Sequence, residues 1–360
     1  MIAGWDAVVI GGGPAGSSAA IMLAEAGYSC LLLEREAFPR ARPGETLHPG
    51  VEPLLRQAGV WDSAALLSTI RPSGVQVSTG DGLKCWRYGE DADGAWRAVN
   101  IARSDLDNLL LDQARRRGVV VTRGHIRALS VFDGRVCGVV TSAGKFRASV
   151  VIDAAGGSHL MARLLRLGIE RRSPPLVAKY GYVRGVVPIA ADQPLFSFDS
   201  VGWTWIARVD ADVTHWTRLN VMPAHQETKL PARRTRPSAV AALPAIGATR
   251  GADATWRIVS APAGRGYFIA GDAAAVLDPA SSDGVIRALL SGRLAGHLAA
   301  LMLARSVHED DAAAHYCGWT REQFERRVTK LSQTYSAALP GWQDAHLDGS
   351  RRRIASQEAH

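Results

Sequence analysis

Three glycines near the amino terminus constrain the fold of this chain more than any other feature. They occur as Gly11-x-Gly13-x-x-Gly16, directly after the apolar letters AVVI and before a run of small residues. A second apolar run, CLLL, then ends at the acidic Glu34. A buried strand, a helix opened by glycines, a second strand and an acidic residue together form the dinucleotide-binding arrangement. The segment therefore predicts the first βαβ unit of a Rossmann-like α/β domain.

Each glycine has a physical task in such a unit. Gly11 permits the tight turn after the strand, Gly13 lets the backbone approach a pyrophosphate, and Gly16 lets the helix pack closely against the strand. The helix begins around Ala15, and its amino end offers unpaired N–H groups and a partial positive charge to phosphate oxygens. We expect these four residues to bind a dinucleotide cofactor.

The acidic residue at the end of the second strand restricts the choice of cofactor. An ionised Glu34 can accept hydrogen bonds from both ribose hydroxyls, and the adjacent Arg35 belongs to the same predicted binding set. A 2′-phosphate would meet a like charge at this position, so NADP is not expected there. The glycines and the acidic residue alone do not distinguish NAD from FAD.

Composition places further limits on the chain. It has 360 residues, an apolar fraction of 47% and a formal net charge of +8, which suit a globular protein that favours anionic partners. The most apolar stretch, Val285–Ala304, contains Arg287, Arg293 and His297, so no membrane span is predicted. A signal peptide is not recognised, and we expect a cytoplasmic location. Four scattered cysteines predict no metal site, and basic clusters without aromatics predict no nucleic-acid binding.

A distant segment, GDAAAVLDPASSDGVIRALLSG (271–292), repeats the pattern of a strand that turns into a helix. The apolar letters YFIA stop at Gly271 and Asp272, and Pro279 and Gly284 precede a helical pattern. Such a turn lies at the carboxyl edge of a sheet, where open α/β folds bind ligands. We therefore expect this segment to face the same ligand as the amino-terminal glycines.

With both segments in view, the chain resembles the FAD-dependent monooxygenase superfamily, and within it the branch of flavin-dependent halogenases and geranylgeranyl-reductase-like enzymes. The resemblance implies FAD as the cofactor and a glutathione-reductase-type FAD-binding domain. It also implies that Asp272, next to Gly271, binds the ribityl or pyrophosphate part. Pro279, Gly284 and Val285 would then lie against the isoalloxazine.

Two other segments extend the resemblance. Arg103 precedes a predicted amphipathic helix in VNIARSDLDNLLLDQARRRG, and the corresponding arginine of the family contacts the cofactor. In PRARPGETLHPG, the resemblance places Arg42 beside the cofactor and Glu45 near the flavin, with His48 toward the substrate. We assign catalysis to His48 and Glu45, because a histidine pKa of roughly 6.5 allows proton transfer near neutrality. A histidine that only packs, or only orients Glu45, is the alternative.

The residues depart from the halogenase pattern at two places. Halogenases of this branch share a catalytic lysine on the strand after this segment and a WxWxIP motif that shields the flavin. Here Gly74 stands near the expected place of the lysine, and Lys84 follows a predicted hairpin turn, out of register. The letters GWTWIARV keep Trp203 and Trp205, the predicted substrate-pocket residues, but have Ala207 in place of proline. These departures favour oxygen insertion over halogenation.

Three functions remain open on this basis. The first is an FAD-dependent monooxygenase that hydroxylates an electron-rich aromatic substrate through a C4a-hydroperoxyflavin, with NAD(P)H or a separate flavin reductase as electron donor. Short segments look closest to flavoproteins that mature tryptophylquinone cofactors, so a tryptophan of an acidic partner protein is a candidate substrate. The second is a reductase or dehydrogenase of the prenyl-reductase kind, or a degenerate halogenase. The third is a non-catalytic flavin-binding docking protein.

The expected organisation has two intertwined parts and a carboxyl-terminal helix. The FAD-binding domain is expected to be discontinuous, from residues 1–72, 100–174 and 256–310. A substrate-side β-sheet domain is expected from residues 73–99 and 175–255. Helical spacing of apolar residues predicts a C-terminal helical segment over 311–347, followed by a mobile tail over 348–360.

Overall fold

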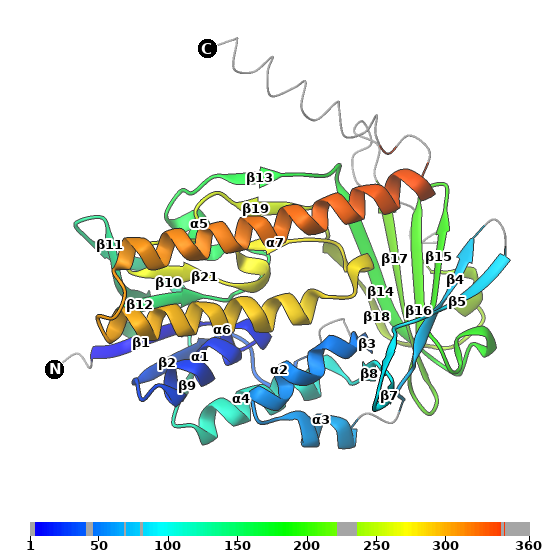
Figure 1. Cartoon of the computed structure of the whole chain (residues 1–360), viewed down its shortest axis with the longest axis horizontal. Helices are drawn as coiled ribbons and strands as arrows, with labels where there is room; N and C mark the ends of the chain where they lie inside the picture. The colour runs from blue at the N-terminus through cyan, green and yellow to red at the C-terminus, as the bar shows by residue number, and fades with distance from the viewer. Residues whose placement is uncertain are drawn as a thin grey trace, which may run out of the picture.

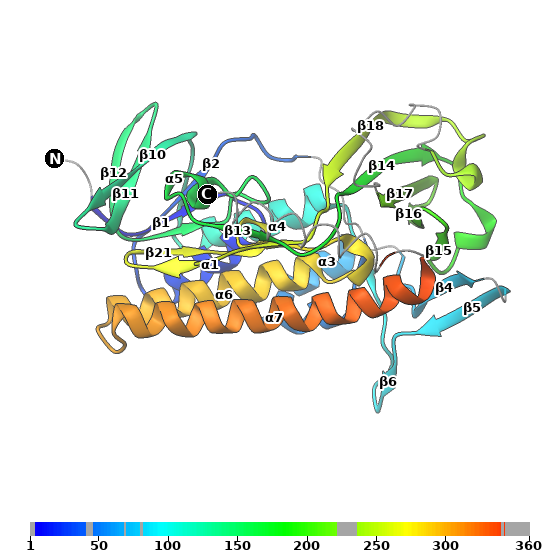
Figure 2. The ribbon, with the colours of Figure 1, turned by 90° about the horizontal axis from the view of Figure 1, so that it is seen from above.

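Two large β-sheets and a layer of helices make up the fold (Figures 1 and 2). The computed structural model describes residues 4–40, 46–67, 70–79, 82–221, 236–339 and 342. Within these residues, the predicted α/β class and the predicted first βαβ unit are confirmed. The tail predicted over 348–360 lies outside the described residues.

The first sheet has a parallel centre. β1 (Gly4–Ile10) pairs in parallel with β2 (Cys30–Glu34) on one side and with β12 (Gly144–Asp153) on the other. β9 (Val120–Arg123) continues the sheet beyond β2, and β21 (Tyr267–Ile269) continues it beyond β12. Because these five strands run in the same direction, their carboxyl ends meet at one edge of the sheet.

An antiparallel meander completes this sheet. β10 (Ile126–Phe132) pairs with β11 (Arg135–Thr141), which in turn pairs with β12. The short β20 (Ala263–Gly264) pairs with β21. The order across the sheet is β10-β11-β12-β1-β2-β9, and the letters VVI and CLLL of the central strands are fully buried, as both faces are covered.

Helices pack on one another beside the parallel strands. α1 (Pro14–Glu25) contacts α4 (Arg103–Arg116) and α6 (Gly284–Leu303), and α6 also contacts α7 (Glu309–Ala338). The α1–α6 approach is close, because a Cβ atom at Gly292 of α6 would lie only 2.0 Å from the Ala15 carbonyl oxygen. α7 is the C-terminal helix expected from the sequence, and it runs from the first sheet to the second (Figures 1 and 2).

The helix α6 also bears on the membrane prediction. By length and composition alone it could cross a membrane, with a mean hydropathy of 1.3 over its most apolar window, so Arg287 and Arg293 do not rule out a span by that criterion. It is the one such helix among the described residues. Its packing against α1 and α7, with Leu289 and Ala295 buried, is that of a core helix, and such helices pass the same test.

The second sheet is mainly antiparallel and has the order β18-β14-β17-β16-β15-β4-β5. Its one parallel pairing joins β15 to β4. In that order its strands are β18 (Ala245–Asp253), β14 (Leu176–Arg184), β17 (Val213–Val221), β16 (Gly202–Asp210), β15 (Leu195–Asp199), β4 (Gly74–Thr79) and β5 (Gly82–Arg87). Apart from β4 and β5, these strands come from a continuous part of the sequence.

Short elements make up the rest of the described structure. The remaining strands are β3 (Thr46–Leu47), β8 (Val99–Asn100), β6 (Glu90–Asp91), β7 (Gly94–Ala95), β13 (Ile169–Arg171), β19 (Arg257–Val259) and β22 (Ala275–Val276). The short helices are α2 (Glu52–Gln57), α3 (Trp61–Leu67), α5 (Leu160–Leu164), and the 3₁₀ turns η1 (Pro49–Val51), η2 (Pro188–Ala190), η4 (Ser238–Val240), η5 (Gly271–Ala273) and η6 (Pro279–Ser281).

Candidate active site

A cavity of about 640 Å³ lies at the carboxyl edge of the parallel strands and reaches the second sheet. Open α/β folds bind ligands at this edge. Around the first sheet, the cavity is lined by the turn after β1, the end of β2, the loop after β12 and residues between Ala270 and Ala288. The second sheet contributes residues of β14, β15, β16 and β17. The site is therefore assembled from segments that are far apart in the sequence.

The glycine turn has the shape that the sequence predicts. Gly11 has a φ of +99°, and a Cβ atom there would lie 2.5 Å from the Ala154 carbonyl oxygen. A Cβ atom at Gly16 would lie 1.8 Å from the Gly11 carbonyl oxygen, so Gly16 allows α1 to approach the turn and does not itself line the cavity. Gly13 lines the cavity and precedes α1 without a side-chain cap. The turn thus leaves room for a phosphate group beside the amino end of α1.

Glu34 holds the carboxyl ends of β1 and β2 together. Its Oε2 accepts a hydrogen bond from the Gly12 N–H at 2.7 Å, and its Oε1 accepts one from the Glu36 N–H at 2.9 Å. The side chain is buried and lies 3.5 Å from an Nη of Arg40. A carboxylate has about four lone-pair sites, so acceptor capacity remains toward the cavity.

A cluster of charged side chains lies next to Glu34. Arg103 is the first residue of α4, not a residue ahead of the helix, and its guanidinium donates to both carboxylate oxygens of Asp107 at 3.0 and 3.2 Å. Asp107 is fully buried and also lies 3.6 Å from Arg40. The sequence prediction missed Arg40 and Asp107, although Arg40 belongs to the same basic run as the predicted Arg42. Both Arg42 and Glu45 lie outside the described residues.

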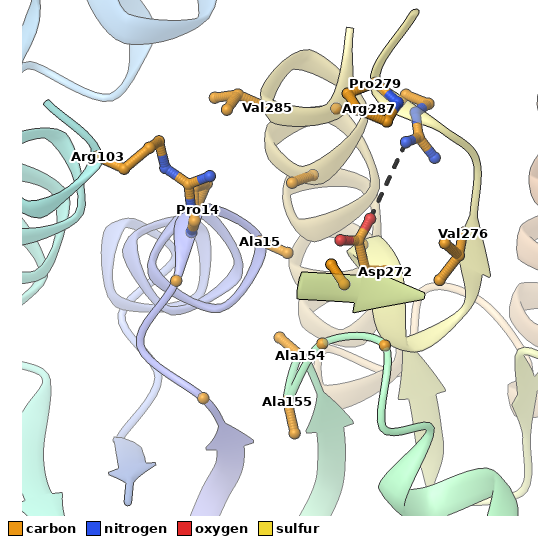
Figure 3. A pocket seen from close by; sticks show the side chains of 18 of the residues that line it. Pro14, Ala15, Arg103, Ala154, Ala155, Asp272, Val276, Pro279, Val285 and Arg287 are labelled. Carbon is orange, nitrogen blue, oxygen red and sulfur yellow. Dashed lines mark ion pairs between the residues drawn. The ribbon is translucent and has the colours of Figure 1, made fainter. Parts of the chain in front are cut away.

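The GDAAAV segment also contributes residues to the lining of the cavity. Asp272 is in the 3₁₀ turn η5, and its carboxylate faces Arg287 of α6 at 4.0 Å (Figure 3). Arg287 also pairs with Asp283. Pro279 and Val285, which the resemblance places against the flavin, line the cavity together with Gly271, Gly284 and the missed Arg287.

His48 lines the cavity next to the 3₁₀ turn η1. Its Nδ1 accepts a hydrogen bond from the Gly50 N–H at 3.1 Å and so caps this turn. Its ring meets Tyr88 edge-on, with 5.5 Å between the centroids. Burial lowers the pKa of His48; the charge of Asp283 raises this pKa and that of Lys330 lowers it, and both influences are smaller than that of burial. At neutral pH the ring is therefore uncharged, and because Nδ1 accepts, its proton is on Nε2.

The second sheet forms an aromatic wall of the cavity. Trp203 is almost fully buried, Trp205 is half-buried, and both line the cavity with Phe196. The rings of Phe196 and Trp203 have centroids 5.4 Å apart. Tyr180 and His215 also line the cavity and were not predicted, because the strand alternation does not reveal which face meets the cofactor side.

Lys84 does not reach this cavity. It lies on the exposed edge strand β5, and none of the described residues that line the cavity is a lysine. Position 74 has no room for a longer side chain in this backbone, since a Cβ atom at Gly74 would lie 2.4 Å from the Trp86 carbonyl oxygen.

Most of the residues predicted for the site converge on one cavity. Those that line it are Gly11, Gly13, Ala15, Glu34, Arg35, His48, Arg103, Trp203, Trp205, Gly271, Asp272, Pro279, Gly284 and Val285. Five arginines also line it, namely Arg35, Arg40, Arg103, Arg163 and Arg287. This positive lining, the open glycine turn and the apolar far end fit a dinucleotide with a pyrophosphate and an aromatic ring system.

Comparison with known proteins agrees with this assignment. The chain is 26% identical over 376 residues to a flavin-dependent halogenase of Armillaria mellea, and 28% identical over 342 residues to a tryptophan 2-halogenase of Chondromyces crocatus. These alignments cover 89% and 86% of this chain but 72% and 63% of the two relatives. The chain thus spans about two thirds of the length of these relatives.

Solved structures show the same fold. The crystal structure of CmlS, a flavin-dependent halogenase, matches with a TM-score of 0.83 at 22% identity, over 96% of this chain and 68% of CmlS. Residues 5–289 match the FAD binding domain family. The expected FAD cofactor and the resemblance to flavin-dependent oxidoreductases of the halogenase branch are thereby confirmed. Because the family match extends over well more than half of its residues, this chain belongs to the FAD binding domain family.

Proposed function

We propose that this protein is an FAD-dependent monooxygenase that hydroxylates an electron-rich aromatic substrate. The observation that carries this proposal is the continuous cavity between the glycine turn and the wall of Trp203 and Trp205, with no lysine among its described lining residues. A reaction of this kind needs a bound flavin, an aromatic substrate held next to it and exclusion of water.

The glycine turn is proposed to hold the pyrophosphate of FAD, and Glu34 the ribose of the adenosine half. Asp272 would bind the ribityl or pyrophosphate part, and the amino end of α6 around Gly284 would face the flavin ring. The first sheet then belongs to the FAD-binding domain and the second to the substrate side. When bound, FAD supplies the electron transfer and the reaction with oxygen.

In this proposal the protein residues position the substrate, exclude water and provide a proton. Trp203, Trp205 and Phe196 offer rigid apolar surface that excludes water from the reacting groups. His48, neutral with its proton on Nε2, is proposed to donate a hydrogen bond toward the oxygen or the substrate. Glu45, which was assigned to catalysis with His48 from the sequence, remains part of this proposal.

An indole is the aromatic group that the proposal favours. One relative is named for tryptophan, and the aromatic wall suits a flat bicyclic ring. We infer further that the indole belongs to a tryptophan of an acidic partner protein, as in the maturation of a quinone cofactor. The net charge of +8 supports such a partner. Electrons would come from NAD(P)H or from a separate flavin reductase.

A degenerate halogenase is the second candidate function. It is favoured by the names of the relatives, which are halogenases, and opposed by the exposed position of Lys84.

Hydroxylation and halogenation can be distinguished by oxygen-18 labelling of the product and by its dependence on bromide. The holoprotein, supplied with NADH and a flavin reductase, is incubated under oxygen-18 with L-tryptophan or with a tryptophan-containing acidic peptide, with and without bromide. We expect a product heavier by one oxygen-18 atom, formed equally without bromide. A bromide-dependent product without oxygen-18 would establish halogenation and contradict the proposal.

A further inference from the structure

A chain of hydrogen bonds runs behind the aromatic wall. The indole N–H of Trp203 donates to the hydroxyl of Tyr335 at 2.7 Å. The Tyr335 hydroxyl in turn donates to the carboxylate of Asp278. Asp278 also accepts from the indole N–H of Trp256 at 2.5 Å and from the Ala280 N–H at 2.9 Å. One carboxylate thus receives three donors and connects indirectly to Trp203.

The side chains that form this series of hydrogen bonds are shielded from water. Tyr335, Asp278 and Trp256 are fully buried, and Trp203 is 1% exposed. A buried polar atom that loses its partner has no water to replace it, so each bond depends on the next one. Burial raises the pKa of Asp278 to about 6, so at neutral pH the carboxylate is ionised and acts as the acceptor at the end of the chain.

This series of hydrogen bonds joins three separate parts of the fold. Trp203 is on β16 of the second sheet and lines the cavity. Asp278 lies between Leu277 and Pro279, which both line the cavity. Tyr335 is on the last turn of α7, and its hydroxyl meets the indole N–H of Trp203. The helix α7 runs past both sheets (Figures 1 and 2).

The ring of Tyr335 is itself held by aromatic neighbours. Its centroid lies 5.6 Å from that of Trp256 and 6.0 Å from that of Phe198, both in edge-to-face geometry, and 4.3 Å from that of Trp342. Such packing fixes the position of the hydroxyl. The donor from Trp203 therefore meets an acceptor at a fixed place.

We propose that Tyr335 and Asp278 are positioning residues that hold Trp203 in the wall of the cavity. The C-terminal helix then contributes to the shape of the site without lining it. This inference rests on the proposed function, in which Trp203 shields the flavin and the substrate from water. Neither residue is among the described residues that line the cavity.

The test compares two tyrosines of the same helix. Tyr335→Phe removes the hydroxyl that holds Trp203. Tyr316→Phe is the matched control, because Tyr316 is also fully buried on α7 and its hydroxyl donates at 2.9 Å to the carbonyl oxygen of Ile269, which does not line the cavity. Both variants are expected to lower the Tm by similar amounts. The readout is the quenching by iodide of the fluorescence of bound FAD, which measures access of solvent to the flavin.

We expect the iodide quenching constant to rise about twofold or more in Tyr335→Phe, because a tryptophan without its anchor visits other rotamers. In Tyr316→Phe it should stay at the wild-type value. Trp203→Phe lacks the indole N–H donor and provides a second test. In this variant, adding Tyr335→Phe should cause little further rise in the iodide quenching constant. Equal quenching in the two tyrosine variants, or additive effects of Trp203→Phe and Tyr335→Phe, would overturn the inference.

The outcome for the proposed function is separate. A wild-type holoprotein that binds FAD but oxidises no aromatic substrate contradicts the monooxygenase proposal. The iodide measurements on the same proteins still decide whether Tyr335 holds Trp203.

Discussion

At the scale of single residues, Gly13 and Gly16 share one turn but have different surroundings. A methyl group at Gly16 would meet the Gly11 carbonyl oxygen at 1.8 Å; this oxygen belongs to the backbone, and the backbone also fixes the place of the methyl carbon. We expect Gly16→Ala to lower the free energy of unfolding by about 2 kcal/mol or more, because overpacking forces the helix away from the strand. Urea unfolding followed by circular dichroism measures this loss.

Gly13→Ala should behave differently. Its new methyl group would meet only the Arg40 guanidinium, at 3.0 Å, and that group is the end of a flexible side chain. The free energy of unfolding should change by about 0.5 kcal/mol or less. FAD affinity should fall about tenfold, because Gly13 lines the cavity and an added methyl group takes up space beside the proposed pyrophosphate site. Calorimetric titration with FAD checks this, and an affinity equal to wild type would show that the pyrophosphate lies elsewhere.

At the scale of elements, His48 has a structural task besides its proposed catalytic one. Because its Nδ1 caps η1, His48→Ala removes both the cap and the imidazole. Asparagine is a good capping residue, so His48→Asn keeps the cap and removes only the imidazole. The pair therefore separates the two tasks.

We expect both His48 variants to retain FAD and to form the oxygen-18 product more slowly, on the order of a hundredfold, if the ring assists the reaction. Only His48→Ala should lose stability, by about 1 kcal/mol. Product formation at the wild-type rate in His48→Asn would reduce His48 to a capping residue.

Apolar periodicity predicts individual strands and helices of this protein but not how its strands pair. Apolar runs predicted β1, β2 and the helix over α4, since burial of one face imposes a repeat on the sequence. The exposed edge position of β5, which keeps Lys84 away from the cavity, depends on pairing between β4 and β15. Pairing between distant strands leaves no local repeat from which to predict it.

At the scale of the whole molecule, Asp278 links stability to pH. Burial is the largest cause that raises its pKa from 3.8 to about 6. The folded state therefore favours the protonated carboxyl, and the stability that this gives is fully present below pH 3.8 and is lost as the pH rises through about 6. Above that range no further change is due to Asp278.

Asp278→Asn removes this titration. We expect the free energy of unfolding of the wild type, minus that of the variant, to fall by up to about 3 kcal/mol between pH 4 and pH 7. Urea unfolding of both proteins at several pH values measures the difference. A difference that stays constant across this range would show that Asp278 titrates normally and is not desolvated.

The sequence by itself determined the dinucleotide-binding unit and the class of fold, whereas FAD was implied only by the resemblance to known flavoproteins. It could do so because glycine geometry, buried strands and a terminal acidic residue act through neighbours in the chain, where spacing records them. Only the tertiary structure decided that Arg40 and Asp107 join the site, that Lys84 does not, and that Tyr335 meets Trp203. These contacts depend on how sheets and helices from distant parts of the chain pack together, and packing of that kind leaves no signature in local spacing.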